Sequence, residues 1–117
     1  MRIGHAVATA LLAAGLAAAA GAAGAQEAGD ADDAVDHGRE LAQEYCVACH
    51  DISADGAFKT YPPSFASIAV FRSDDQIRGR IIFPPSHSTM PQIGYLLEPE
   101  SVRDLVAFIR SLEQPVE

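Results

Sequence analysis

The chain contains 117 residues and carries a formal net charge of −8 when its histidines are counted as neutral. A chain of this length allows one domain, and its acidic balance argues against binding to nucleic acid, which requires a basic surface. We expect instead a monomer whose protein partners carry a basic docking patch, because opposite potentials speed encounter.

The first 25 residues have the three parts of a secretory signal peptide. Arg2 supplies the positive start, residues 6–20 form an apolar run rich in alanine, and residues 23–25 offer the small side chains that a signal peptidase reads. The alternative is a retained membrane anchor, but the run is too short and too poor in leucine for a permanent span. We therefore expect cleavage after Ala25, a periplasmic protein without a membrane span, and a net charge of −9 after the loss of Arg2.

The mature chain is expected to hold a short leader, one domain and a short tail. Residues 26–34 are acidic, small and without periodicity, which predicts a disordered leader. The domain is expected over residues 35–114 and the tail over residues 115–117. No run alternates with a period of two and no repeat divides the chain, so the predicted fold class is all-α.

Apolar spacing and end signals predict the helices. The strongest pattern lies near the C-terminus, where Pro99 suits a first helical position and apolar residues recur on one face. Ser73 and Gln76 have the spacing of a capping box, which opens a helix. In chain order, the expected segments are a helix from residue 35 or 36 to about 47, a loop over 51–61, a short apolar turn at 65–71, and helices at about 74–83 and 99–112.

Gly38 lies inside the first expected helix, where a glycine costs about 1 kcal/mol relative to alanine. A glycine at such a position often marks close contact with another element. Phe108, beside the apolar face of the last helix, is the natural side chain to lie across Gly38. An exposed glycine without a partner is the alternative.

Residues 46–50, with the sequence Cys-Val-Ala-Cys-His, form the most specific motif in the chain. Two cysteines three positions apart, followed at once by a histidine, are typical of a c-type haem attachment site. In this interpretation the sulfur atoms of Cys46 and Cys49 bond covalently to one haem, and His50 offers a ring nitrogen to the iron.

Two other interpretations of the cysteine pair remain open. A redox disulfide of the thioredoxin type requires a βαβ frame, which the surrounding pattern does not provide. A zinc site could combine the motif with His37 or His87, but structural zinc usually requires a second closely spaced pair of ligands, and these two histidines are isolated from each other. Haem attachment is favoured over both.

The second axial position of the iron is expected to be taken by Met90, the one methionine after residue 25. Met90 lies in a polar loop bounded by prolines, between the motif and the last helix, rather than in an apolar stripe. His87 is the competing ligand, and a methionine that fills a gap in the core is the other alternative. Thioether ligation is the arrangement found in cytochromes c, where it raises the reduction potential.

Taken together, these residues resemble the class I c-type cytochrome family over about residues 36–112. The resemblance rests on these features in chain order: Gly38 eight positions before Cys46, the motif at 46–50, Pro-Pro-Ser-Phe at 62–65, Met-Pro at 90–91, and Leu-Val-Ala-Phe-Ile at 105–109. It implies a cytochrome c fold of three to five helices around one covalently bound haem, with the first and last helices crossing at Gly38 and Phe108. It also implies that the carbonyl group of Pro63 accepts a hydrogen bond from the His50 ring nitrogen that is not on the iron.

The function implied by this resemblance is the transfer of single electrons between redox proteins, through an iron held by His50 and Met90, without enzymatic activity. A haem subunit of one specific periplasmic dehydrogenase or oxidase is the alternative. An open-iron haem protein that binds gases or acts as a peroxidase is a further alternative, against which Met90 argues.

Overall fold

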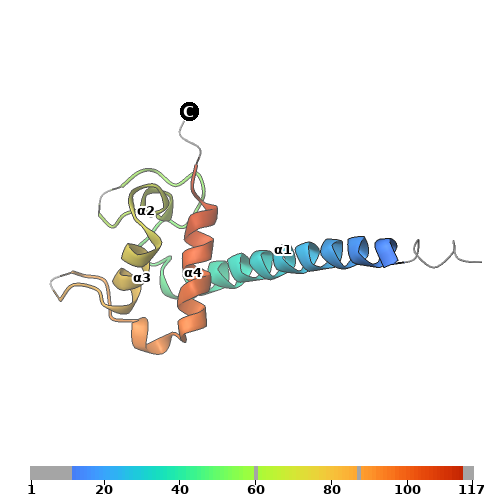
Figure 1. Cartoon of the computed structure of the whole chain (residues 1–117). Helices are drawn as coiled ribbons and strands as arrows, with labels where there is room; N and C mark the ends of the chain where they lie inside the picture. The colour runs from blue at the N-terminus through green and yellow to red at the C-terminus, as the bar shows by residue number, and fades with distance from the viewer. Residues whose placement is uncertain (1–11, 60, 87, 115–117) are drawn as a thin grey trace, which may run out of the picture. The chain divides into compact units, whose positions relative to one another are not determined.

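The computed structural model describes residues 12–59, 61–86 and 88–114. The chain divides into two compact units, Met1–Ala31 and Asp32–Glu117, and the site described below lies in the second. Within the described residues the regular structure is helical, without a β-strand, and the predicted all-α class is confirmed. The elements are α1 (Leu12–Tyr45), α2 (Phe65–Phe71), α3 (Asp74–Ile82), the 3-10 helix η1 (Gly94–Leu96) and α4 (Pro99–Ser111), as Figure 1 shows.

α1 is already helical at Leu12, the first described residue, well before the start expected at residue 35 or 36. The prediction of a disordered leader over residues 26–34 was therefore wrong, because the helix runs through it. Alanine, the best helix former, is frequent between residues 12 and 34, and proline is absent there. Residues 27–33 are all exposed, so this part of the helix has no buried face and shows no apolar periodicity.

The expected signal peptide is described only in part. Residues 1–11 and the tail at 115–117 lie outside the described residues, so cleavage after Ala25 stays a prediction. None of the helices in the described ranges is both long enough and apolar enough to cross a lipid bilayer.

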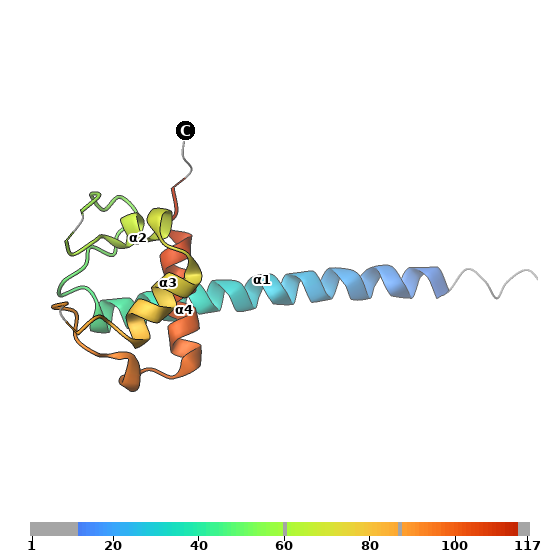
Figure 2. The ribbon, with the colours of Figure 1, turned by 60° about the vertical axis from the view of Figure 1, so that its left-hand side comes forward.

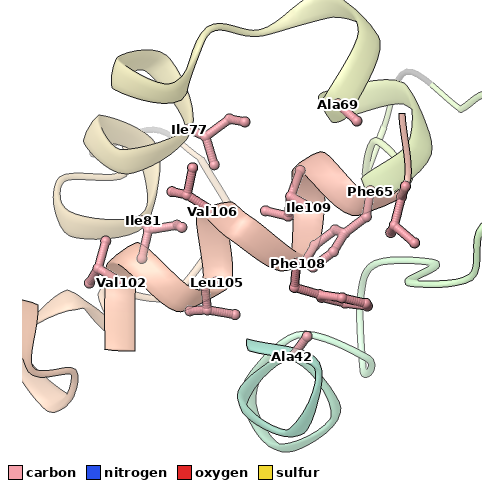
Figure 3. Packing of buried hydrophobic residues seen from close by; sticks show 11 residues of the cluster. Ala42, Phe65, Ala69, Ile77, Ile81, Val102, Leu105, Val106, Phe108 and Ile109 are labelled. Carbon is pink, nitrogen blue, oxygen red and sulfur yellow. The ribbon is translucent and has the colours of Figure 1, made fainter. Parts of the chain in front are cut away.

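α4 lies at the centre of the core and packs against both α2 and α3. The apolar face expected for this helix is confirmed, since its buried residues include Val102, Leu105, Val106, Phe108 and Ile109. Figure 3 shows the side chains from other helices that meet it: Ala42 from α1, Phe65 and Ala69 from α2, and Ile77 and Ile81 from α3.

The part of α1 after Asp32 crosses α4 at Gly38 (Figure 2). A Cβ atom built on Gly38 would lie 2.6 Å from the carbonyl carbon of Asp104 and 2.8 Å from the Cβ atom of Phe108. Real side chains do not tolerate such distances, so only glycine lets the two backbones come this close. The expected crossing at Gly38 and Phe108 is confirmed.

α3 begins with the expected capping box, because the Gln76 amide donates to Ser73 Oγ at 3.3 Å and the Ser73 amide donates to Gln76 Oε1 at 3.0 Å. The helix ends at Ile82, one residue before the expected end. The sequence did not predict η1. Gly94 in η1 packs so closely on α3 that a Cβ atom there would lie 2.6 Å from the Cα atom of Ile82. The two ends of the loop at 83–93 are thereby held close together.

Candidate haem site

Residues 46–50 follow α1 directly as overlapping turns. The amides of Cys46 and Val47 both donate to the carbonyl oxygen of Ala42, at 2.9 and 3.0 Å. The amides of Cys49 and His50 donate in turn to the carbonyl oxygen of Cys46, at 3.1 and 2.9 Å. These bonds hold the two thiols and the imidazole on one compact segment, and both cysteines are free thiols.

A cavity of about 410 Å³ lies next to this segment, with walls from α2, α3 and α4. Ligand cavities in proteins commonly have volumes of roughly 300–1,000 Å³. Cys46, Cys49, His50 and Met90 all line it, so the structure brings the four residues expected to bind haem around one space. Pro63 lines the same cavity.

The deeper walls of this cavity are apolar. They include Phe65 from α2, Ile77 and Ile81 from α3, and Leu105 and Ile109 from α4. All five side chains are buried and belong to the hydrophobic core. A flat apolar ligand in this space would therefore be in contact with the core on one side and with the motif on the other.

His50 is oriented by two neighbours. Its Nδ1 atom lies 2.6 Å from the carbonyl oxygen of Pro63, and its ring centroid lies 5.5 Å from that of Phe65. Because Nδ1 must donate to this carbonyl group, the lone pair of the neutral ring is on Nε2. Nε2 is therefore the nitrogen that His50 can offer to a metal, and the carbonyl group fixes the ring for that purpose.

The two cysteines differ in exposure: Cys49 is exposed and Cys46 is half-buried. Burial raises the pKa of the Cys46 thiol to about 11, and the neighbouring Cys49 adds to this rise. The thiolate is the reactive form of a cysteine, so the raised pKa makes the free Cys46 thiol less reactive at neutral pH than an unperturbed one. A thiol with a raised pKa is poorly suited to a redox disulfide.

Met90 is half-buried in the loop between α3 and η1. A turn precedes it, in which the amide of Ser88 donates to the carbonyl oxygen of Pro85 at 2.9 Å. A second turn follows it, in which the amide of Ile93 donates to the carbonyl oxygen of Pro91 at 3.0 Å. Local hydrogen bonds on both sides thus shape the segment that carries Met90 along the cavity.

The alternative ligands receive no support from the described residues. His87 lies outside them, so the choice of Met90 over His87 stays a prediction. Within the described part of the chain, no group of three His, Cys, Asp or Glu side chains is placed to hold a metal ion. His37, one of the two histidines considered for a zinc site, has its Nδ1 atom 2.7 Å from Oδ2 of Asp104 at the crossing of α1 and α4.

The cavity wall also contains polar groups that are not among the site residues predicted from the sequence. Arg72 and Arg80 line the cavity, and neither guanidinium group forms an ion pair within the described residues. Arg78, two positions before Arg80, instead pairs with Asp75 at 2.9 Å. The Oγ atom of Ser88, another wall residue, is buried without a hydrogen-bond partner among the described residues.

These features fit haem c. Its ring is flat and apolar, which suits the walls, and its two carboxylate groups suit a site with two free guanidinium groups and an unpaired hydroxyl group. The thiols of Cys46 and Cys49 would provide the points of covalent attachment. An imidazole and a thioether are the axial ligand types that cytochromes c use.

An all-α domain with a Cys-x-x-Cys-His segment in the wall of an apolar cavity is the arrangement of a c-type cytochrome. The family model described as cytochrome c oxidase, cbb3-type, subunit III matches residues 33–109. The chain belongs to this family, which confirms the resemblance to class I c-type cytochromes and implies covalently bound haem c and redox partners. No curated protein and no solved structure matches the chain.

Proposed function

We propose that the protein is a periplasmic electron-transfer protein with one haem c, attached through Cys46 and Cys49 and ligated axially by His50 and Met90. The observation that carries this proposal is that these four side chains line one apolar cavity. When bound, haem supplies a centre that takes up and releases single electrons.

In this proposal each residue of the site has a defined role. The hydrogen bond from His50 Nδ1 to the Pro63 carbonyl group fixes the tautomer and makes the ligand more basic. Met90 contributes a thioether, which raises the reduction potential. The buried walls exclude water from the site, and burial together with the ligand pair sets the potential. With both axial positions taken by the chain, no position is left for a substrate, so the role is electron transfer rather than catalysis.

The test is the colour of protein expressed in a periplasm that has a cytochrome c maturation system. We expect a red protein that keeps its haem on a denaturing gel, and we expect Cys46→Ala or Cys49→Ala to weaken that retention. Material that stays colourless under these conditions would contradict covalent haem binding.

The axial ligand has a separate optical test. The oxidised protein should show the weak band at the red end of the spectrum that marks sulfur on ferric haem. Met90→Ala should abolish this band, whereas His87→Ala should retain it. A parent protein that lacks the band would contradict Met90 as the ligand and leave His87 as the candidate, and rapid carbon monoxide binding by the whole reduced sample would favour an open iron.

A second candidate function follows from the description of the matched family, which names a subunit of a cytochrome c oxidase. In this alternative the protein is a permanent subunit of one enzyme complex and transfers electrons within it, instead of moving between partners. A stoichiometric oxidase or dehydrogenase that co-purifies with the protein supports the subunit. A monomer that is reversibly reduced and oxidised in solution, and that binds partners with a basic patch only transiently, supports the free carrier.

The periplasmic location rests on the sequence of the first 25 residues. Export places the two thiols in the compartment where bacterial c-type haem is attached. The mature protein should begin at Gln26, which N-terminal sequencing or intact mass will determine. A protein that retains residues 1–25 after export would be anchored rather than released.

A further inference from the structure

One hydrogen bond joins two loops at the exposed side of the haem cavity. The hydroxyl groups of Tyr61 and Thr89 lie 2.7 Å apart, although the residues are 28 positions apart in the chain. Both side chains are exposed, and both also line the cavity. Thr89 directly precedes Met90, so this bond reaches the segment that carries the proposed axial ligand.

The other hydrogen bonds of this segment are local. Ser88 donates to Pro85 and Ile93 donates to Pro91, all within the loop at 83–93. Among the described residues of that loop, the Thr89 hydroxyl group makes the one hydrogen bond to a distant part of the chain. The loop is fixed at its ends by α3 and η1, but the Tyr61–Thr89 bond is what ties its middle to the opposite wall.

We propose that Tyr61 is a positioning residue that, through Thr89, holds the Met90 segment closed over the haem. This inference rests on the proposed ligation of the iron by Met90. A thioether is a weak ligand, so the closed state depends on how the chain holds the segment. Opening of the segment breaks the Tyr61–Thr89 bond, and an external ligand can reach the iron only from the open state.

The expected change in the open population follows from the free energy that one hydrogen bond contributes. Loss of a single neutral bond of this kind raises the population of the open state about two- to tenfold. The apparent affinity of an external ligand rises by the same factor, because it is proportional to the fraction of protein that is open. The closed state still predominates, so the ligand band of the resting protein is unchanged.

The experiment is a titration of the oxidised holoprotein with imidazole, followed by the loss of the sulfur-to-iron band. Tyr61→Phe and Thr89→Val each remove one hydroxyl group and keep the shape of the side chain. We expect each variant to bind imidazole about two- to tenfold more tightly than the parent. The double variant should bind no more tightly than the single variants, because both changes remove the same bond.

Tyr95→Phe is the matched control. Tyr95 is also an exposed tyrosine, and its hydroxyl group makes no hydrogen bond within the described residues. Its loss should leave imidazole binding at the parent level. A purely structural role for Tyr61 would lower the unfolding temperature without changing the imidazole affinity, and that result would overturn the proposal.

The remaining outcomes separate this inference from the proposed function. If the parent shows the sulfur band but Tyr61→Phe and Thr89→Val bind imidazole as the parent does, the positioning role is wrong and the ligation stands. Additive effects in the double variant also overturn the positioning role, because the two hydroxyl groups would then act separately. If the parent lacks the sulfur band, both the ligation and this inference fail.

Discussion

Arg110 of α4 reaches across to Asp74 at the start of α3, with its Nε atom 2.5 Å from the Oδ1 atom of Asp74. The same guanidinium group also donates to the carbonyl oxygens of Ala69 and Arg72, at the end of α2. Carbonyl groups at the end of a helix have no partner inside the helix. One side chain therefore provides such partners for α2 and ties both middle helices to α4.

Arg110→Gln should lower the free energy of unfolding by about 1.5–3 kcal/mol, the range for hydrogen bonds that involve a charged group. The control is Arg103→Gln on the same helix. The Arg103 side chain is 64% exposed, against 27% for Arg110, and pairs with Glu100 one turn away. An exposed pair of this kind contributes little to stability. Denaturant unfolding of the holoprotein will measure the loss of unfolding free energy in each of the two variants. Equal losses for Arg110→Gln and Arg103→Gln would contradict the role of Arg110.

Gly38→Ala should destabilise the protein, although alanine normally favours a helix by about 1 kcal/mol over glycine. The added methyl group would meet the backbone of Asp104 at 2.6 Å, and overpacking of this kind typically costs about 1–3 kcal/mol. Gly79→Ala in α3 is the matched control, because a Cβ atom there has no neighbour within 4 Å. That variant should gain up to about 1 kcal/mol. A stabilising Gly38→Ala would show that α1 and α4 do not cross this tightly.

Arg72→Gln and Arg80→Gln should each lower the reduction potential. Both arginines line the cavity, and loss of a positive charge there favours the more positive ferric iron. A unit charge about 10 Å away, at an effective dielectric constant of about 20, corresponds to a change on the order of 70 mV for one electron. Arg78→Gln should change the potential little, because Arg78 is already paired with Asp75. Spectroelectrochemical titration measures the reduction potentials of all three variants. A larger shift for Arg78→Gln than for the other two would contradict the placement of Arg72 and Arg80 beside the haem.

Haem-free protein should show unequal reactivity of its two cysteines at pH 8. The pKa of Cys46 is raised to about 11, so at pH 8 its thiol is almost entirely protonated, and its thiolate fraction increases as the pH approaches 11. We expect alkylation of Cys46 to be at least about tenfold slower than that of the exposed Cys49. Mass spectrometry of partly labelled protein will measure both rates. Urea should remove the difference, and equal rates without urea would show that the haem-free chain does not hold Cys46 in this environment.

Local patterns predicted most of the elements around the site. The capping box at Ser73 and Gln76, the apolar face of α4 and the glycine at the helix crossing each depend on a few residues with a fixed spacing. The haem motif is local for the same reason, since covalent attachment and ligation need adjacent residues. Such features are visible in a sequence because the physical requirement and the residues that meet it lie within one or two turns.

The parts that sequence reasoning missed depend on contacts between distant segments. Arg72 after α2 and Arg80 on α3 have the appearance of ordinary exposed arginines until these helices are placed against the cavity. The Tyr61–Thr89 bond joins two loops whose sequences carry no shared pattern. The early start of α1 was missed for another reason, because a fully exposed helix needs no apolar periodicity.

The contact between His37 and Asp104 spans 67 positions, so the crossing of α1 and α4 closes a loop that contains the whole haem motif, both middle helices and Met90. A chain that emerges from a ribosome or a translocation pore with its N-terminus first has no α4 until almost all of it has appeared. Throughout that interval the segment that carries the cysteine pair is not yet closed by α4. The proposed attachment of haem, made within that interval, would precede closure of the last helix.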